Sequence, residues 1–274
     1  MGGSDTLTTE RTYLTRDEFL ESYTRVGSGR RLLPSLRWLP LEYTPELSEL
    51  LGYLFGDGSL ERSYRQGPVR PKGVDFISDC DVVRNRVAEL FAFCFLAAPH
   101  LRVFRATKGL RLRDAAVARA LWVLGLPIGA KVYQPSDVPL WIKKSPSEFK
   151  RRFIRAYFDC DASTPFKITR SKASFAIRLT VNKLERHIPA GIGFLNSIKS
   201  LLYDFGVECN GPYIRHSKKY INMYGEITVM LELLIQRQAS FLAYGKEIGF
   251  TVPAKQQKLN NFLDIIVKSW AITP

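Results

Sequence analysis

The stretch LLGYLFGDG occupies residues 50–58, and a second stretch of the same design, IRAYFDCDA, occupies residues 154–162. Each is an apolar run of helical character that contains small residues and ends in an acidic residue, Asp57 in the first copy and Asp161 in the second. The helix of the first copy is expected to begin ahead of this stretch, with Pro45 in its first turn, where a helix tolerates proline. We therefore expect two helices that each end in a carboxylate, arranged as two half-sites around one shared centre.

Small residues recur at matching places in the two copies. Gly52 and Gly56 are four residues apart, and Ala156 and Cys160 occupy the same two places in the second copy. A glycine inside a helix costs about 1 kcal/mol relative to alanine, so the glycine pair needs a structural reason. Small residues at this spacing let two helix backbones approach closely. We expect these four residues to form a helix interface, which would bring the two terminal carboxylates together.

Two carboxylates held together repel each other and titrate as a coupled pair unless a cation lies between them. Oxygen ligands without histidine or cysteine support favour Mg²⁺ over zinc. We expect Asp57 and Asp161 to bind metal, with the carbonyl groups of Gly56 and Cys160, at the helix ends, as further oxygen ligands. A divalent ion there can activate water and stabilise a leaving oxygen in phosphodiester cleavage.

The two stretches resemble the paired motifs of the LAGLIDADG homing endonucleases, in the single-chain form that carries both motifs. In the first copy the leucine, glycine and Asp-Gly positions match, with Phe55 in place of the first aspartate. The second copy keeps the Asp-x-Asp, but alanine replaces two glycines and arginine replaces the first alanine. The segment 124–142 is similar to the linker that precedes the second motif in family members, so the resemblance covers roughly residues 45–270.

The resemblance implies an α+β fold of two pseudo-symmetric αββαββα halves, each with a saddle-like antiparallel sheet facing DNA, joined by a two-helix interface. It divides the chain into an N-terminal extension (1–44), a first half (45–145) and a second half (146–274). It implies an intron-encoded monomer that cleaves both strands of a long, pseudo-asymmetric duplex site and leaves staggered ends. Two or more Mg²⁺ ions would serve the hydrolysis, and Mn²⁺ would substitute for them.

Family members often add a peripheral lysine or glutamine that polarises the attacking water or steadies the transition state. Lys255, which opens the predicted last helix, is the catalytic candidate in the second half, and Lys131, in the linker, is the candidate in the first half. Lys183 stands after a predicted strand, at another position that the family can use for a basic residue. For each lysine taken alone, an ordinary surface role is the alternative.

The chain is strongly basic. It has 274 residues, a formal net charge of +14 and a pI near 9.7, and basic residues outnumber acidic ones in both halves. This excess favours a polyanionic partner, double-stranded DNA, over a merely solvated basic surface, with host intron RNA as a second candidate. The hydrophobic fraction of 46% allows one or two large cores.

Several classes of protein are disfavoured. There is no apolar run of about eighteen residues and no secretory h-region, which predicts a cytoplasmic protein without membrane contact. The four cysteines lack paired CxxC spacing and the three histidines are scattered, so no zinc site, HNH cluster or catalytic triad is expected. Arginine outnumbers lysine and asparagine is scarce, which favours a GC-rich prokaryotic or archaeal host and leaves an organelle open.

Alternating apolar and polar residues between turn signals predict half-buried strands. Leu110 and Leu112, for example, alternate with Arg111 and Arg113. A sheet face of polar and basic side chains can lie in the major groove, where each base pair presents a distinct pattern of donors and acceptors. For any single strand, a plain solvent face is the alternative. The DNA-binding candidates are Ser59, Glu61, Ser63, Arg65, Arg70, Lys72, Arg111, Arg113, Lys167, Thr169, Arg178, Thr180, Tyr213, Arg215, Tyr220, Asn222 and Tyr224.

Each half is predicted as helix, hairpin, helix, hairpin, helix. The first half has expected strands near 59–66, 73–78, 101–106 and 109–113, and helices at 80–97 and 115–124. The second half has expected strands near 165–171, 174–181, 212–216 and 219–224, and helices near 192–205, 226–237 and 255–268. The segment 183–192 is predicted to be an irregular insertion. In the extension we expect a helix from about Asp17 and a basic loop at 27–31, whose Arg30 and Arg31 either pack or contact the DNA backbone.

Three alternatives stay open. One keeps the fold without the chemistry, as an intron RNA maturase or a catalytically weak DNA-binding protein. The second is a haloacid-dehalogenase phosphatase, because FDCDAST resembles its DxDx[ST] opening with Asp159 as nucleophile, although that motif normally follows a buried strand rather than a basic run. The third is an intein-embedded domain. The lack of splice-junction cysteine or serine at the ends favours a free-standing endonuclease instead.

Overall fold

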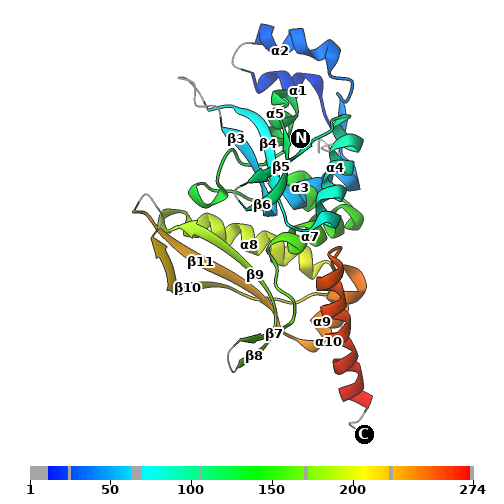
Figure 1. Ribbon diagram of the computed structural model, residues 1–274, viewed down its shortest axis with the longest axis vertical. Helices are drawn as coiled ribbons and strands as arrows, with labels where there is room; N and C mark the ends of the chain where they lie inside the picture. The colour runs from blue at the N-terminus through cyan, green and yellow to red at the C-terminus, as the bar shows by residue number, and fades with distance from the viewer. Residues whose placement is uncertain are drawn as a thin grey trace, which may run out of the picture.

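The computed structural model describes residues 12–23, 26–62, 69–104, 106–169, 172–221 and 225–271. The fold is α+β, with two similar halves arranged about a central pair of helices. These helices are α3 (Pro45–Gly56) and α7 (Ser147–Asp161). In Figure 1 the first sheet lies above this pair and the second sheet lies below it. The two motif stretches therefore sit at the junction of the halves.

The N-terminal extension folds as short elements. They are β1 (Tyr13–Leu14), α1 (Arg16–Glu21), α2 (Val26–Leu32), η1 (Leu33–Ser35) and β2 (Leu41–Glu42). The helix α1 begins close to the expected Asp17 because Thr15 and Glu18 form a capping box. The expected basic loop at 27–31 is wrong: these residues belong to α2, with Arg30 and Arg31 in its last turn.

Aromatic rings and one arginine join the extension to the first half. The ring of Phe19 meets that of Trp38, and Trp38 meets Phe95, with centroids 5.7 and 5.2 Å apart. The guanidinium of Arg119 lies 3.9 Å from the ring centroid of Tyr23. Such contacts combine apolar burial with cation–π attraction. The extension therefore packs into the core of the first half.

The first half follows the predicted order of elements. After α3 come β3 (Gly58–Arg62), β4 (Pro71–Ile77), α4 (Asp81–Phe95), β5 (His100–Phe104), β6 (Thr107–Leu112) and α5 (Ala115–Val123). The four strands form one antiparallel sheet in the order β3-β4-β6-β5. Leu60, Val74 and Leu110 are buried on one face of this sheet, while Ser59, Asp75 and Arg111 alternate with them on the other.

A linker leads to the second half through η2 (Lys131–Tyr133) and α6 (Leu140–Lys144). After α7 come β7 (Phe166–Thr169), β8 (Lys172–Phe175), β9 (Ile177–Leu184), η3 (Glu185–His187), α8 (Ile188–Tyr203), β10 (Asn210–Ile221), β11 (Ile227–Ile235), α9 (Gln238–Glu247) and α10 (Pro253–Ala271). Strands β10, β11 and β9 form an antiparallel sheet in that order, and β7 pairs with β8. Ala162 also bridges to Leu179, so the segment after α7 takes the edge place that β3 has in the first half.

Three expectations for the second half are wrong. Residues 226–237 are not a helix, because Ile227–Ile235 forms the central strand of the sheet. The two strands expected at 212–216 and 219–224 are not separate, because Asn210–Ile221 form one strand, β10, with an irregular register between Arg215 and Lys219; residues 222–224 lie outside the described part. The segment 183–192 is not an irregular insertion, because it contains the end of β9, η3 and the start of α8.

The physical reason for the main error lies in the sequence ITVMLELLI. A short, continuous apolar run does not reveal by periodicity whether it is a buried strand or a buried helix. Here the run pairs with β9 on one side and β10 on the other, so its backbone groups are satisfied by the sheet.

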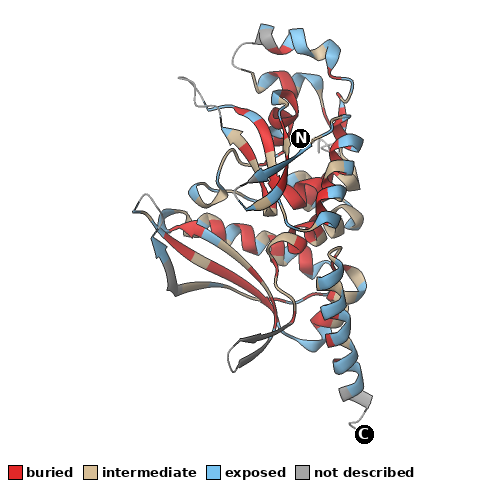
Figure 2. Cartoon of the chain, viewed as in Figure 1, coloured by how far each residue is buried: buried red, intermediate tan, exposed pale blue. Residues whose placement is uncertain are grey.

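Buried side chains concentrate along α3, α7 and α8 and on the sheet faces that these helices cover (Figure 2). Among the described residues, no helix has both the length and the apolar character needed to cross a membrane.

Candidate active site

The helices α3 and α7 make the most extensive contact between any two elements of the described chain. Gly52 of α3 packs directly against α7. A methyl group added at Gly52 would meet the carbonyl oxygen of Phe153 and would lie 2.9 Å from the Cβ of Ala156. Gly56 faces Cys160, whose Sγ would lie 2.9 Å from a methyl group there. The backbones are therefore too close for any larger residue, as the predicted interface requires.

Polar contacts fix the amino-terminal ends of the same two helices, and the sequence reasoning missed them. The hydroxyl of Ser48 is fully buried and donates to the carbonyl of Phe149 at 2.9 Å. Arg152 of α7 donates to Glu46 of α3 at 2.6 Å and to Glu148 on its own helix at 2.7 Å. These contacts hold the crossing of the helices at one end, which determines where their carboxyl ends meet.

The two predicted carboxylates lie at those carboxyl ends. Asp57 is the residue that caps α3, with its N–H donating to the carbonyl of Tyr53 at 3.0 Å, and Asp161 is the last residue of α7. Both are partly buried, and they interact electrostatically, since the charge of Asp57 helps to raise the pKa of Asp161. The helix interface thus brings together two carboxyl groups that are about a hundred residues apart in the chain.

Loss of solvation controls the charge of this pair. Burial raises the pKa of Asp161 to about 6, although the positive charge of Lys131 and a hydrogen bond with Tyr157 oppose the increase. Burial also raises the pKa of Asp57, against a hydrogen bond with Cys160 and the charges of Lys131 and Lys255. The site therefore favours the addition of positive charge next to these carboxylates.

The thiol of Cys160 lies within the same cluster. Burial and the two neighbouring aspartates raise its pKa well above the ordinary value, so the thiol stays protonated. A protonated thiol is a poor ligand for a metal ion. The side chain of Cys160 thus fills the interface, and only its carbonyl remains as a candidate ligand.

The two candidate catalytic lysines occupy equivalent places at the helix ends. The ammonium of Lys131 donates to the carbonyls of Leu54, Phe55 and Gly56, at 2.9, 2.7 and 2.5 Å. These carbonyls belong to the last turn of α3, where the helix dipole favours a cation. Burial lowers the pKa of Lys131, and the charges of the aspartates partly offset this.

Lys255 repeats this arrangement in the second half. Its ammonium donates to the carbonyls of Asp159 and Ala162, both at 2.7 Å, and to that of Phe158 at 3.3 Å. Burial lowers its pKa, and several nearby acidic groups oppose the decrease. Each lysine therefore supplies one positive charge to one helix end and uses its donors on backbone carbonyls.

The first aspartate of the second motif, Asp159, has a structural place. It is 5% exposed, and its carboxylate accepts hydrogen bonds from the N–H groups of Thr251 at 2.9 Å and Val252 at 3.2 Å. The hydroxyl of Tyr53, on α3, donates to it at 3.3 Å. Asp159 thus holds the turn before α10, and its burial argues against the role of phosphatase nucleophile.

The donors at the helix ends match the preferences of Mg²⁺. Carboxylate oxygens are available on Asp57 and Asp161, and no arginine forms an ion pair with either among the described residues. Groups of three or more His, Cys, Asp or Glu side chains that could hold a metal ion are absent from the described part of the chain. An ion at these helix ends would be held by the two carboxylates, helix-end carbonyls and water, a ligand set typical of Mg²⁺. The carbonyl of Gly56 already accepts from Lys131.

The outer face of the first sheet carries paired charges. Asp75 and Arg111 are opposite each other on β4 and β6 and form an ion pair, with the Arg111 side chain only 12% exposed. Glu61 pairs with Lys72 at 3.2 Å. Arg70 and Arg113 are exposed. Of the candidates here, Arg111 is held against the sheet, and Lys72 is the more accessible.

The outer face of the second sheet is organised around Glu232. Glu232 belongs to the central strand, β11, and is 1% exposed. It lies opposite Thr180 of β9 and Tyr213 of β10. It forms ion pairs with both Arg178 and Arg215. The two arginines are partly exposed. A buried acid therefore orients two neighbouring guanidinium groups on this face, and sequence reasoning overlooked it.

The remaining DNA-binding candidates divide by how far the structure describes them. Tyr220 is exposed on β10. Ser63, Arg65, Asn222 and Tyr224 lie outside the described residues. Lys167 and Thr169 belong to β7, but their side chains are also outside the described part.

No protein-family model matches the chain. Among curated proteins, it is 28% identical over 214 residues to the tRNA-splicing ligase RtcB of Methanopyrus kandleri, which covers 70% of this chain and 20% of that protein. It is 25% identical over 249 residues to the DNA-directed RNA polymerase subunit Rpo1N of Methanocaldococcus jannaschii, which covers 84% of this chain and 18% of that protein. The chain spans about a fifth of the length of these relatives.

Solved structures of similar arrangement include mesophilic variants of the homing endonuclease I-DmoI, with 12% identity, a TM-score of 0.49, and coverage of 74% of this chain and 95% of that chain. They also include full-length DUF199/WhiA from Thermatoga maritima, with 15% identity, a TM-score of 0.48, and coverage of 96% of this chain and 69% of that chain. The homing endonuclease I-WcaI, bound to its DNA recognition sequence, gives 11% identity, a TM-score of 0.44, and coverage of 94% of both chains.

The fold repeats the two-motif design of the sequence. The two motif helices cross through small residues, each ends at an acidic residue, and each begins a unit with the same order of strands and helices. These features give the chain the two-motif α+β fold that its resemblance to the single-chain LAGLIDADG homing endonucleases predicted.

Proposed function

We propose that this protein is a site-specific endonuclease that hydrolyses both strands of double-stranded DNA with Mg²⁺. The observation that carries the proposal is the pairing of Asp57 and Asp161 at adjacent helix ends, in surroundings that raise the pKa of both carboxyls. Two poorly solvated carboxylates destabilise each other unless positive charge is added. Such an arrangement is costly for stability and is typical of a functional site.

The residues divide into distinct roles in this proposal. Asp57 and Asp161 would hold two or more Mg²⁺ ions, with Mn²⁺ able to replace them. When bound, such an ion polarises the scissile phosphodiester and makes water a stronger nucleophile. Lys131 and Lys255 fix the carboxyl ends of α3 and α7 and add positive charge beside each aspartate.

The proposed substrate is a long duplex with two dissimilar half-sites. The net charge of +14 favours binding to the phosphate backbone, and the outer faces of the two sheets carry arginine, lysine and tyrosine side chains. The charged groups on the two sheets differ, so the halves at 45–145 and 146–274 would contact different sequences. We propose that the protein acts as a monomer and leaves staggered ends.

A second candidate keeps DNA or intron RNA binding without efficient cutting. One observation favours it: Lys131 and Lys255 already place two positive charges next to the two aspartates, which reduces the repulsion that a divalent ion would otherwise relieve. Measured binding of Mg²⁺ by the protein distinguishes the two candidates, because only the endonuclease requires it.

The chain is also similar to parts of an RNA ligase and of an RNA polymerase subunit, two proteins of unrelated activity. Recurrence of one segment in unrelated proteins is expected of a mobile module that is inserted into hosts, as an intein-borne endonuclease is. We propose that this chain descends from such a module and that the activities of the ligase and polymerase do not extend to it.

The test is a selection of cleaved duplexes from a randomised library, followed by cleavage assays on the selected site. Asp57→Asn and Asp161→Asn should bind this site with unchanged affinity and lose cutting of it. Asp264→Asn, on the exposed side of α10, is the matched control and should cut normally. Failure of the wild-type protein to cut any duplex, or normal cutting by both aspartate variants, would overturn the proposal.

A further inference from the structure

Lys183 is a buried lysine that the proposed chemistry does not use. It lies near the end of β9, is 3% exposed, and points toward the linker between the two halves. Its ammonium donates to the carbonyl of Lys131 at 2.6 Å, to the carbonyl of Gln134 at 2.9 Å and to the hydroxyl of Ser136 at 3.1 Å. An ammonium group has three donors, so all of them are used on the linker.

The surroundings of Lys183 show that this contact is built into the fold. A methyl group at Gly191 of α8 would lie 2.8 Å from the Cγ of Lys183, so the glycine leaves room for the lysine stem. Among the described residues, Lys183 has no carboxylate partner, and burial, with the charge of Lys131, lowers its pKa to about 8. A buried cation held only by carbonyl and hydroxyl groups is expensive and requires that the linker stay in place.

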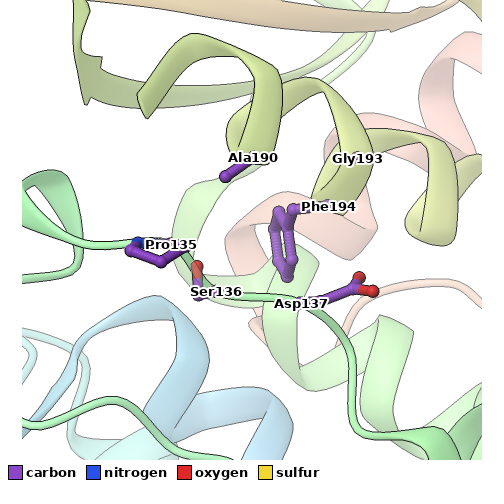
Figure 3. Close-up of a pocket in the computed structure, with 6 residues that line it drawn as sticks. All are labelled: Pro135, Ser136, Asp137, Ala190, Gly193 and Phe194. Carbon is purple, nitrogen blue, oxygen red and sulfur yellow. The ribbon is translucent and has the colours of Figure 1, made fainter. Parts of the chain in front are cut away.

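The linker follows the surface of α8 next to this contact. Figure 3 shows residues 135–137 passing alongside the helix, with Ala190 and Phe194 turned toward them. These residues line a shallow depression of about 350 Å³. Elements of the second half, β9 and α8, thus determine the path of the linker. The same linker carries Lys131, which contacts the end of α3 in the first half.

Lys131 is consequently held at both ends. Its backbone carbonyl accepts from Lys183 of the second half, and its ammonium donates to the last turn of α3, beside Asp57 of the first half. Lys183 itself is too deeply buried to contact DNA. It can influence the candidate centre only through the position of Lys131.

We propose that Lys183 is a positioning residue that fixes Lys131 against the carboxyl end of α3, so that the second half controls the geometry at Asp57 in the first half. The expected functional effect rests on the proposed endonuclease activity, whereas the structural effect does not. Loss of Lys183 should loosen the backbone of the linker and of the end of α3, and it should leave the backbone at the end of α7 unchanged, because Lys255 donates to the carbonyls of Asp159 and Ala162 there.

The first experiment measures structure without activity. Amide hydrogen exchange in Lys183→Met is compared with wild type over residues 129–136 and over the end of α3. Exchange should increase at least about tenfold in both segments, and it should not change at residues 158–162. Ser136→Ala, which removes one acceptor, should give a smaller increase in the same places and serves if Lys183→Met does not fold. Lys246→Met, on exposed Lys246, is the control. Unchanged exchange over 129–136 in both Lys183→Met and Ser136→Ala would refute the proposal.

The second experiment follows each strand separately in a supercoiled plasmid that contains the selected site. Lys183→Met should slow one strand by about 10–100-fold, as loss of an outer-sphere partner commonly does, and so accumulate nicked circles. Lys131→Met should slow the same strand, and the double variant should be no slower than Lys131→Met alone. Equal slowing of both strands, or additive effects, would overturn the proposal. If wild type cuts no duplex, the proposed function fails, while the exchange experiment still decides the role of Lys183.

Discussion

Asp161→Asn should make the protein more stable at pH 8, although it removes a residue proposed to be essential for cleavage. The carboxyl of Asp161 is partly buried at the end of α7, next to Asp57, and its pKa is raised from 3.8 to about 6. Burial is the main cause, and the charge of Asp57 adds to it. The ionised carboxylate is therefore a local source of instability in the absence of a bound cation.

The sign follows from proton linkage. A carboxyl whose pKa is higher in the folded state binds its proton more tightly there, so ionisation destabilises the folded protein as the pH rises. The penalty is absent below about pH 4 and complete above about pH 6, which is the reverse of an aspartate in a salt bridge. The change in pKa corresponds to about 3 kcal/mol. Since Asp161 is partly exposed, we expect Asp161→Asn to exceed wild type in its free energy of unfolding at pH 8 by about 1–3 kcal/mol.

Asparagine has the shape of a protonated aspartate and no charge, so the variant should escape this penalty. The free energy of unfolding, measured with urea at pH 4 and pH 8 in the presence of EDTA, should differ between Asp161→Asn and wild type only at pH 8. Asp264→Asn, an exposed substitution, should show no such difference at either pH. Mg²⁺ at about one hundred times its Kd should add about 2.7 kcal/mol to wild type and much less to the variant.

Two results would refute this reasoning. If Asp161→Asn and wild type differ by the same amount at pH 4 and pH 8, the carboxyl is not perturbed by the fold. If wild type is the more stable protein at pH 8 without Mg²⁺, then Lys131 stabilises the ionised carboxylate more than burial destabilises it.

Three further perturbations test the structure around the centre. Gly56→Ala should lower the free energy of unfolding by about 1–3 kcal/mol through overpacking, and a second change, Cys160→Gly, should restore most of it; a double variant as unstable as the sum of both would contradict the interface. Asp159→Ala should lower the free energy of unfolding by about 1–3 kcal/mol, because two N–H groups lose their acceptor. It should also increase amide exchange at residues 251–256. Unchanged exchange there would exclude the role of Asp159 in holding the turn before α10. Glu232→Gln should lower the free energy of unfolding by about 1.5–3 kcal/mol. It should also weaken sequence preference in one half-site, measured by selection of bound duplexes, with little change in the salt dependence of binding. An altered salt dependence with intact sequence preference would show that Arg178 and Arg215 contact only phosphates.

The central helices could be predicted from sequence because several local signals agree there. Small residues four apart need a close helix partner, and the acid at the end of each run marks where the pair must meet. None of these signals depends on distant parts of the chain. The same is true of the first sheet, where turn residues separate short alternating strands, so the predicted strands and helices lie close to the observed ones.

Contacts between distant segments could not be predicted in this way. The roles of Lys183 and Asp159 arise from partners between about fifty and a hundred residues away, so the motif of Asp159 and the strand before Lys183 do not reveal these contacts. Glu232 did carry a signal, since it is the sole acid in the apolar run 227–235. A single charge in a run that is otherwise buried requires a partner, and this is a reason to expect an arginine on a neighbouring strand.

The pseudo-symmetry of the centre is limited to its reactive groups and the backbone that carries them. Each half presents one aspartate and one lysine at a helix end, but the two lysines are fixed by unrelated means. Lys131 depends on Lys183, whereas Lys255 depends on the carboxylate of Asp159 at the turn before α10. The first motif has Phe55 where the second has Asp159, and Phe55 packs against Phe153 and Phe194 instead of capping a turn. A motif without the capping aspartate must hold its lysine from elsewhere, and the buried Lys183 meets that need from the opposite half. Substitutions of Lys183 or Asp159 should therefore slow the proposed cleavage of the two DNA strands unequally, even though Asp57 and Asp161 remain in place.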